Sequence, residues 1–267
     1  MQRFTPALLV FLFLVFCTAT AQAQGKPANL AAQEQRLAKL YEKLLSFAQR
    51  DYDSTELYSE RFDTEFKRSI RNNSATLNYP FRMLTNNNYC SMETAPGGAF
   101  RIYSWDTWTG GTMHFFHSIY QWRAGGKVYT SIPAYDEGDP GSFCSKIYTL
   151  RDGARTYYLA VSNAIYSTKD ARQSVAVYAF DGGKLIDTVK LFRTGKERLE
   201  RIDVDFDFFS VVDRPERPLQ LITYDEKRGI LYIPVVGRKD AVTGRNILYQ
   251  WKGRYFQFIA IEKGKRK

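Results

Sequence analysis

Ile119-Tyr120-Gln121-Trp122-Arg123-Ala124-Gly125-Gly126-Lys127-Val128 consists of two largely apolar runs on either side of a glycine pair. Glycines between such runs are typical of a β-hairpin, because tight hairpin turns need positive φ angles that glycine adopts without steric cost. Closely similar phrases recur at 177–185 and 248–256. We therefore expect three hairpins, with the tyrosine and the second aromatic residue of each phrase on one face of a strand.

Further strands are expected around each hairpin, because short apolar or alternating runs follow one another from residue 79, separated by Gly, Pro, Asn and Asp. They group into three meanders of about 45 residues, the size of a propeller blade. The expected strands are 89–92, 100–105, 112–122 and 127–132; 146–150, 156–162, 174–180 and 184–192; 219–224, 229–236, 246–251 and 254–261; an extra strand covers 202–211.

The predicted fold class is mainly β, built from antiparallel four-stranded meanders. The three phrases are unevenly spaced, and closed propellers use about 4 to 8 blades. We therefore expect a degenerate propeller-like arrangement, with a β-sandwich or a barrel as the alternative. The β-domain is predicted to occupy residues 76–267.

An N-terminal helical pair is predicted over residues 24–75. Apolar residues recur at three- and four-residue steps within 28–50, which is typical of an amphipathic helix. A second helix is expected to start after Asp53, which can cap free backbone amides while Glu56 completes a capping box. Both apolar stripes need a partner surface, so the helices are expected to pack on each other or on the β-domain.

Residues 1–23 have the pattern of a secretory signal peptide. Arg3 precedes an apolar run over 7–17, and Ala21-Gln22-Ala23 forms a small-x-small cleavage site. Lipidation at Cys17 is the alternative, but Phe16 stands where such signals need a small residue. We therefore expect a periplasmic or secreted protein, with no transmembrane segment after cleavage because no other stretch is sufficiently apolar.

The predicted compartment determines how the net charge and the cysteines are interpreted. The formal net charge is +10, which for an exported protein favours acidic glycans, anionic envelope surfaces or acidic proteins as partners rather than nucleic acid; solubility alone is the simpler interpretation. Cys90 and Cys144 are the two cysteines after the predicted cleavage site. An even pair in an oxidising compartment favours a disulfide, with two separate buried thiols as the alternative.

The segment 100–117 is the densest in aromatic residues and holds both histidines. A turn over 106–111 would present Trp108 as a stacking platform for a sugar or a peptide. The candidate ligand-binding residues are Trp105, Asp106, Trp108 and His114. The competing interpretation is that these aromatic residues pack across neighbouring strands.

Metal and cofactor chemistry finds no support in the sequence, so no metal site and no cofactor are expected. His114 and His117 would point to opposite faces of a strand. The alternating Asp203, Asp205 and Asp207 lack the glycine of a calcium loop and instead predict a half-buried strand with a wet acidic face. No nucleophile elbow, phosphate-binding loop or dinucleotide-binding motif occurs.

The segments 100–116 and 221–236 resemble parts of uncharacterised exported β-rich proteins of Gram-negative bacteria with propeller-blade-like meanders. This resemblance implies an exported protein and transfers no functional residue. We expect a non-catalytic binding module for an extracytoplasmic protein or glycan. The alternative is a polymer hydrolase that uses an unrecognised Asp/Glu pair, since a fold can bring any two carboxylates together. Function is expected where the repeats differ: the loops 106–111, 135–142 and 238–244.

Overall fold

The computed structural model describes residues 29–71, 73–153, 155–212 and 219–263. The predicted signal peptide at residues 1–23 lies outside the described residues. The described chain begins with helices α1 (Leu30–Phe47) and α2 (Tyr52–Ile70) and continues through the short helices η1 (Ser74–Leu77) and α3 (Arg82–Asn86) into three β-sheets. Among the described helices, none is both long enough and apolar enough to cross a membrane.

The first two sheets contain the strands predicted for the first two meanders. The helix-side sheet has the order β1 (Ser91–Thr94), β2 (Phe100–Asp106), β3 (Phe116–Ala124) and β4 (Lys127–Ser131). The central sheet has the order β11 (Arg201–Asp207), β7 (Asp170–Asp181), β6 (Arg155–Ile165) and β5 (Phe143–Asp152), with β8 (Lys184–Ile186) paired to the far end of β7. All neighbouring strands in both sheets are antiparallel.

The end sheet contains the third meander and two short strands from the β8–β11 connection. Its order is β10 (Arg198–Leu199), β9 (Phe192–Arg193), β15 (Phe256–Ile261), β14 (Val242–Trp251), β13 (Ile230–Val236) and β12 (Thr223–Asp225). Only the pairing of β15 with β9 is parallel among its described strands. The predicted class is confirmed: the fold is mainly β, with antiparallel four-stranded meanders at β1–β4, β5–β8 and β12–β15 and an N-terminal helical pair.

Each recurring phrase forms a hairpin, as predicted. In the first copy Ala124 pairs with Lys127, and the two glycines between them have φ angles of 55° and 76°. In the second copy Asp181 pairs with Lys184 around Gly182 and Gly183, and in the third copy the turn joins β14 to β15. The local glycine signal therefore fixed all three turns, because positive φ at such positions costs other residues steric strain.

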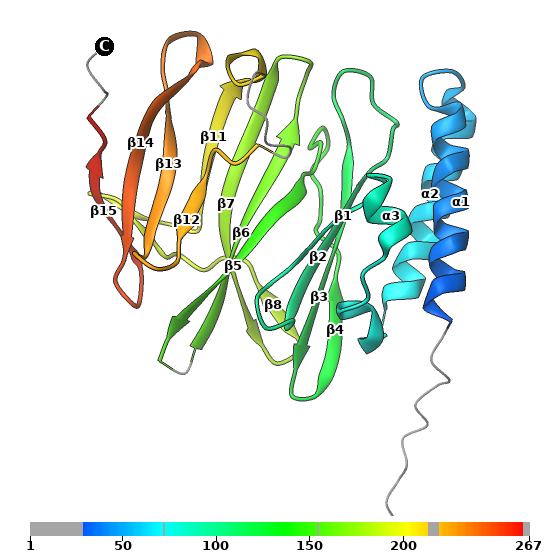
Figure 1. The fold of residues 1–267 in the computed structure, drawn as a ribbon, viewed down its shortest axis with the longest axis horizontal. Coiled ribbons are helices and arrows are strands. Elements are labelled where there is room, and N and C mark those ends of the chain that lie inside the picture. Colours follow the sequence, from blue (N-terminus) through cyan, green and yellow to red (C-terminus); the bar gives the residue numbers. More distant parts are fainter. Residues whose placement is uncertain (1–28, 72, 154, 213–218, 264–267) are drawn as a thin grey trace, which may run out of the picture.

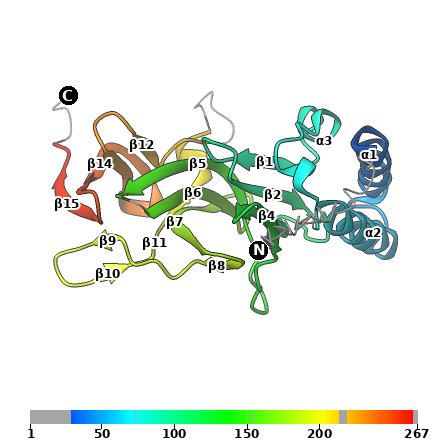
Figure 2. The same cartoon turned by 90° about the horizontal axis from the view of Figure 1, so that it is seen from below.

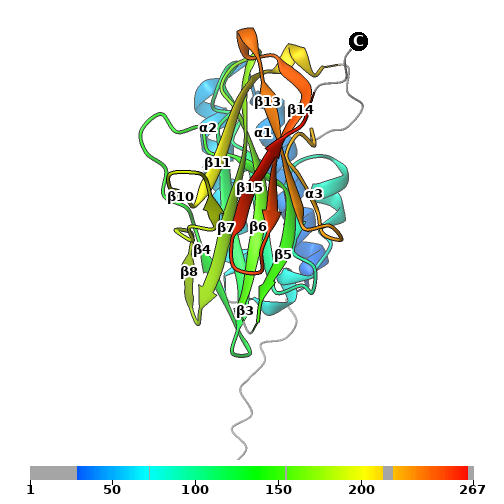
Figure 3. The same cartoon turned by 90° about the vertical axis from the view of Figure 1, so that its left-hand side faces the viewer.

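The three sheets and the helical pair stack as successive layers from one end of the molecule to the other (Figure 1). Viewed from the end opposite the helices, β15 lies nearest the viewer (Figure 3). The helices cover the outer face of the helix-side sheet, where the rings of Phe62 and Phe66 lie 5.7 and 5.3 Å from that of Trp105. This packing buries the apolar stripes of both helices, as their periodicity required.

Aromatic residues dominate the core between the helix-side and central sheets. Trp122 stacks on Phe180 with ring centroids 5.2 Å apart and an interplanar angle of 10°, and its Nε1 donates a hydrogen bond to Gly182 O at 3.2 Å. The rings of Tyr120 and Tyr178 lie 5.5 Å apart. Equivalent positions of the first two hairpins thus pack directly on one another across the interface between two sheets.

The opposite face of the central sheet packs on the end sheet through aliphatic residues. Leu159, Val175 and Val177 are fully buried there against Leu231 and Phe256. Alternate residues of β6 and β7 therefore serve two different cores, which explains why these strands are apolar on both faces. The central sheet is the layer that joins the two ends of the fold.

Buried polar side chains fasten the helical segment to the helix-side sheet. Glu34 of α1 accepts hydrogen bonds from Tyr79 Oη at 2.9 Å and from the Met83 amide at 2.5 Å, which places a carboxylate on the free amides at the start of α3. Arg101 Nη1 donates to Tyr79 O at 2.5 Å, and Gln121 Nε2 donates to Ile70 O at 3.1 Å. The helices are therefore held by directional contacts as well as by apolar burial.

The start of α2 differs from the sequence prediction. The helix begins at Tyr52, and its N-cap is Asp51 rather than Asp53. Asp51 has extended backbone angles, and its Oδ1 accepts a hydrogen bond from the Ser54 amide at 3.2 Å. Asp53 lies in the first turn, where its charge still favours the helix N-terminus. The pattern located the helix, but two nearby aspartates left the capping position open.

The disulfide prediction is wrong. Cys90 and Cys144 are free, buried thiols that belong to different cores. Cys90 packs with the helices on the outer face of the helix-side sheet, whereas Cys144, on β5 of the central sheet, lies in the core between the two sheets. Their thiols donate to the backbone oxygens of Ser91 and Lys146. Burial raises the pKa of both thiols, which makes them poor nucleophiles.

Replacement of Trp122 tests the role of the stack between the first two hairpins. We expect Trp122→Ala to lower the free energy of unfolding by about 3–5 kcal/mol, because a fully buried indole is lost. Trp122→Phe keeps a ring but loses the hydrogen bond to Gly182 O, so its cost should be about 0.5–1.5 kcal/mol. Urea denaturation measures both. The half-buried Trp251 of the third hairpin is the control, and an equal cost for Trp251→Ala would contradict this role.

Candidate functional site

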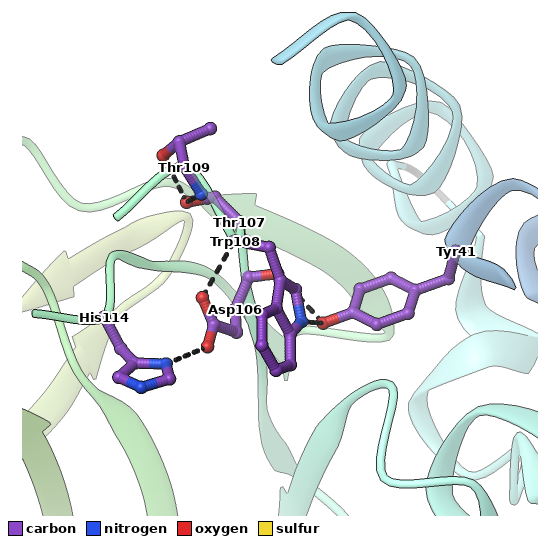
Figure 4. Close-up of polar contacts among 6 residues, drawn as sticks. All are labelled: Tyr41, Asp106, Thr107, Trp108, Thr109 and His114. Atoms are coloured by element: carbon purple, nitrogen blue, oxygen red, sulfur yellow. Dashed lines mark hydrogen bonds and ion pairs between the residues drawn. The ribbon is translucent and has the colours of Figure 1, made fainter. Parts of the chain in front are cut away.

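Asp106, at the end of β2, organises the turn that the sequence marks as a candidate site (Figure 4). Its Oδ1 accepts a hydrogen bond from the Trp108 amide at 2.9 Å, and its Oδ2 accepts one from His114 Nδ1 at 2.5 Å. Trp108 has a φ of 57°, a left-handed conformation that the Asp106 carboxylate holds in place. A single side chain therefore fixes both sides of this turn.

The two tryptophans of this turn face the helices. Trp105 is 2% exposed and forms part of the core beneath α1 and α2. Trp108 is half-buried against the same core, and its Nε1 donates to Tyr41 Oη at 3.1 Å, while Tyr41 Oη donates to Asp106 O at 2.9 Å. Figure 4 shows this chain of contacts linking α1 to the turn. Asp106, Trp108 and His114 thus form one hydrogen-bonded group whose polar atoms are largely occupied within the protein, whereas the buried Trp105 Nε1 has no hydrogen-bond partner among the described residues.

Within this group, His114 has a side chain that is partly exposed and a pKa that departs from its usual value. Its side chain is 30% exposed. The hydrogen bond to Asp106 raises the pKa of His114 above its usual value, burial opposes the change, and the charge of Asp106 adds to it. Because an ionised carboxylate only accepts hydrogen bonds, Nδ1 carries a proton and Nε2 is the atom that can gain or lose one. Its amide also donates to Ile165 O at 3.1 Å, joining the turn to the central sheet.

His117 lies in a separate polar group. Its Nδ1 contacts Asp63 Oδ1 at 2.8 Å, and Lys67 Nζ lies 2.7 Å from Asp63 Oδ2. Burial alone would raise the pKa of Asp63, but these two partners outweigh it and lower the pKa. Among the described residues, no group of three or more His, Cys, Asp or Glu side chains is placed to hold a metal ion.

A cleft of about 1010 Å³ lies on the face of the central sheet that looks toward the helix-side sheet. Its floor consists of small side chains in cross-strand register on β6 and β7, namely Ala160 with Ala176, and Ser162 with Ser174, followed by Ala164. Large rings fill the same face one pair further on, at Tyr158 and Tyr178. The cleft opens where small residues replace aromatic ones, because the two sheets then have too little side-chain volume to fill the space.

One wall of the cleft is the loop from Pro133 to Ser142, which includes the predicted functional segment 135–142. Gly141 has a φ of 65°, and a Cβ there would lie 2.2 Å from Phe116 O, so only glycine allows this approach of the loop to β3. The Phe116 amide donates to Pro140 O at 2.7 Å. The ring of Tyr135 stacks on His117 at 5.8 Å, and its buried hydroxyl has no hydrogen-bond partner among the described residues. The wall is therefore anchored at both ends.

The opposite wall is the connection from β8 through β9 and β10 to β11, which runs along one side of the molecule (Figure 2). Where it enters β11, Arg172 of β7 forms a bidentate ion pair with Asp205 at 2.6 and 2.8 Å, and Asp203 pairs with Arg201. The ring of Tyr166 lies 5.4 Å from the Arg172 guanidinium. The predicted acidic face of this strand is thus largely compensated by arginine.

Of the loops in which the sequence predicted function, only 135–142 lines the cleft. Trp105, Asp106, Trp108 and His114 do not line the cleft. The cleft residues that sequence reasoning missed are alanines and serines on β6 and β7 together with charged residues of the β8–β11 connection. Small residues facing each other on adjacent strands carry a weak sequence signal, because the pairing register is needed to see them as one surface. No protein-family model and no curated protein matches the chain.

The His114–Asp106 pair gives a pH-dependent prediction. A histidine whose pKa rises on folding adds stability that is complete below the unfolded value of about 6.5 and is lost as the pH rises through the folded value. We expect Asp106→Asn to return the pKa of His114 toward its usual value and to remove this dependence.

NMR titration of the imidazole resonances measures the pKa, and urea unfolding at about pH 5.5 and about pH 8.5 measures the linked stability. His117→Gln assigns the signals, because the chain has only two histidines. An unchanged His114 titration in Asp106→Asn would contradict the pairing.

Proposed function

We propose that this protein is a non-catalytic, extracytoplasmic binding module that holds a segment of a partner protein or a glycan in the cleft of the central sheet. The observation that carries this proposal is the cleft itself. Its volume of about 1010 Å³ lies at the upper end of the range for ligand sites, and its floor is a regular strand pair rather than a mobile loop. A rigid floor lowers the ordering cost of binding.

The chemistry of the lining favours recognition of a hydrated polymer. The hydroxyl-bearing residues Ser162, Ser174, Tyr166 and Tyr178 line the cleft alongside charged residues. Polar groups with aromatic rings at their sides suit sugars and peptides, since both ligands present hydrogen-bonding edges and apolar faces. The extracytoplasmic location rests on the signal sequence predicted at residues 1–23.

A binding role fits the carboxylates of the cleft better than a hydrolytic one. A general acid in a glycosidase is held protonated by burial in apolar surroundings. Of the seven cleft carboxylates, Asp203 pairs with Arg201 and Glu200 is half-buried. The other five are exposed, namely Asp136, Glu137, Asp139, Asp187 and Glu197. Exposed carboxylates can attract and orient a ligand, and they lack the apolar surroundings of a glycosidase general acid.

Filling the cleft tests this proposal. Ala176→Trp places an indole on the cleft floor, whereas Ala260→Trp makes the same change on the exposed strand β15, away from the cleft lining. Glycan and peptide arrays probed with the purified protein should give binding that Ala176→Trp weakens at least tenfold and Ala260→Trp preserves. Ser174→Phe serves as a second filling variant if Ala176→Trp does not fold, as judged by circular dichroism.

Two results would overturn the proposal. One is the absence of any ligand on both arrays. The other is full retention of binding in a folded Ala176→Trp or Ser174→Phe variant, because a ligand in the cleft cannot avoid a ring on its floor.

A further inference from the structure

We infer that the cleft recognises cationic groups, and that its ligand is an extended chain bearing several ammonium or guanidinium groups, most simply a lysine- or arginine-rich segment of a partner protein. This inference rests on the proposed function and adds the ligand class. A cationic ligand is the opposite of the acidic partner that the net charge of +10 suggests.

The first observation is a local inversion of charge. The chain holds 38 Lys and Arg against 28 Asp and Glu, yet the cleft is lined by seven acidic side chains and four basic ones. The seven acidic side chains come from three separate parts of the chain: the wall loop, the β8–β11 connection and strand β11. Their convergence is a property of the fold rather than of one acidic run in the sequence.

The second observation is the state of those charges. Three of the four basic side chains are already engaged: Arg172 with Asp205, Arg201 with Asp203, and Arg198 over the ring of Tyr255 at 5.9 Å. Five of the acidic side chains form no ion pair or side-chain hydrogen bond within the described part of the chain. These are Asp136, Glu137, Asp187, Glu197 and Glu200. The uncompensated charge of the cleft is therefore negative.

The third observation is that the cleft already shows how it holds a cation. The Arg172 guanidinium, which lines the cleft, forms two hydrogen bonds with the carboxylate of Asp205 at the cleft edge of β11 and lies 5.4 Å from the ring centroid of Tyr166. Carboxylates and aromatic faces together are the usual partners of ammonium and guanidinium groups. Tyr120 and Tyr178 bring further rings to the same cleft beside its unpaired carboxylates.

The exposure of these carboxylates sets the strength and the salt dependence of binding. An exposed ion pair contributes little to binding because water and salt screen it, so one cationic group would bind weakly and several on one chain are needed. Charges at the rim of a cleft are screened over about 8–10 Å at physiological ionic strength. Binding should therefore weaken steeply as salt is added.

The experiment titrates the purified protein with spermine, with a penta-lysine peptide, and with neutral and acidic oligosaccharides of similar length. Chemical shifts of the backbone amides are followed by NMR. We expect the two cationic probes to perturb amides of the cleft floor and walls, and affinity to fall at least tenfold between about 50 and 300 mM salt. Tighter binding of the peptide than of spermine identifies a protein segment as the source of the charge; the reverse identifies a free polyamine.

Matched double variants separate the cleft carboxylates from general acidity. Asp187→Asn with Glu200→Gln removes two unpaired charges from the cleft, whereas Glu56→Gln with Glu60→Gln removes two exposed charges from α2. We expect about tenfold weaker binding of penta-lysine for the cleft pair and no change for the α2 pair. All four substitutions lie on exposed or half-buried side chains, so folding is preserved.

The failures of the two proposals give different results. Binding of the neutral or acidic oligosaccharides in the cleft, without binding of either cationic probe, overturns the cationic ligand class and leaves the binding function intact. Equal loss of penta-lysine binding in both double variants also overturns it, because attraction would then come from the whole surface. Absence of cleft perturbation by every probe overturns this inference, and with empty arrays it overturns the binding function as well.

Discussion

The stack of Trp122 on Phe180, reinforced by the bond from the indole to Gly182 O, is the contact on which the rest of the structure depends. It joins the first two copies of the recurring hairpin face to face, so the helix-side sheet must meet the central sheet at this aromatic core. The other face of each sheet is then free for a second layer, the helices on one side and the end sheet on the other. The cleft is a consequence of the same contact, because the sheets held together by these rings separate where the side chains become small.

The local parts of this fold were predictable from the sequence, because they depend on residues close together in the chain. Glycine pairs fixed the hairpins at Gly125 and Gly182, and apolar periodicity located both helices within a few residues. Long-range pairings were not predictable. The parallel contact of β9 with β15 and the placement of β11 beside β7 join segments whose sequences carry no mark of their partner. The disulfide prediction failed for the same reason, since an even number of cysteines does not show which core of the fold each thiol occupies.

The candidate site shows how a dense sequence signal can have a structural cause. The aromatic residues around Asp106 are concentrated where the helical layer, the helix-side sheet and the central sheet meet, and Tyr41 and Ile165 both bond to this turn. Three layers that converge at one turn need large rings and satisfied polar atoms, so the segment is conspicuous whether or not it binds a ligand. The cleft is inconspicuous for the converse reason. The cleft forms because large side chains are absent at Ala160, Ser162, Ala176 and their neighbours. Amino-acid composition does not indicate where such an unfilled space lies.

The net charge of the chain and the local charge of the cleft likewise differ. A net charge of +10 describes the average field that a distant partner encounters, whereas a bound ligand responds to the groups within a few ångströms. The β8–β11 connection, residues 187–200, carries four basic and three acidic residues, so its sequence is close to neutral. The basic residues are Lys190, Arg193, Lys196 and Arg198, and the acidic ones are Asp187, Glu197 and Glu200. Only the fold, by stacking Arg198 on Tyr255 while the carboxylates stay unpaired, separates the two signs. A basic protein can thus present an acidic cleft, and the net charge of the chain need not match the charge of the cleft that its fold creates.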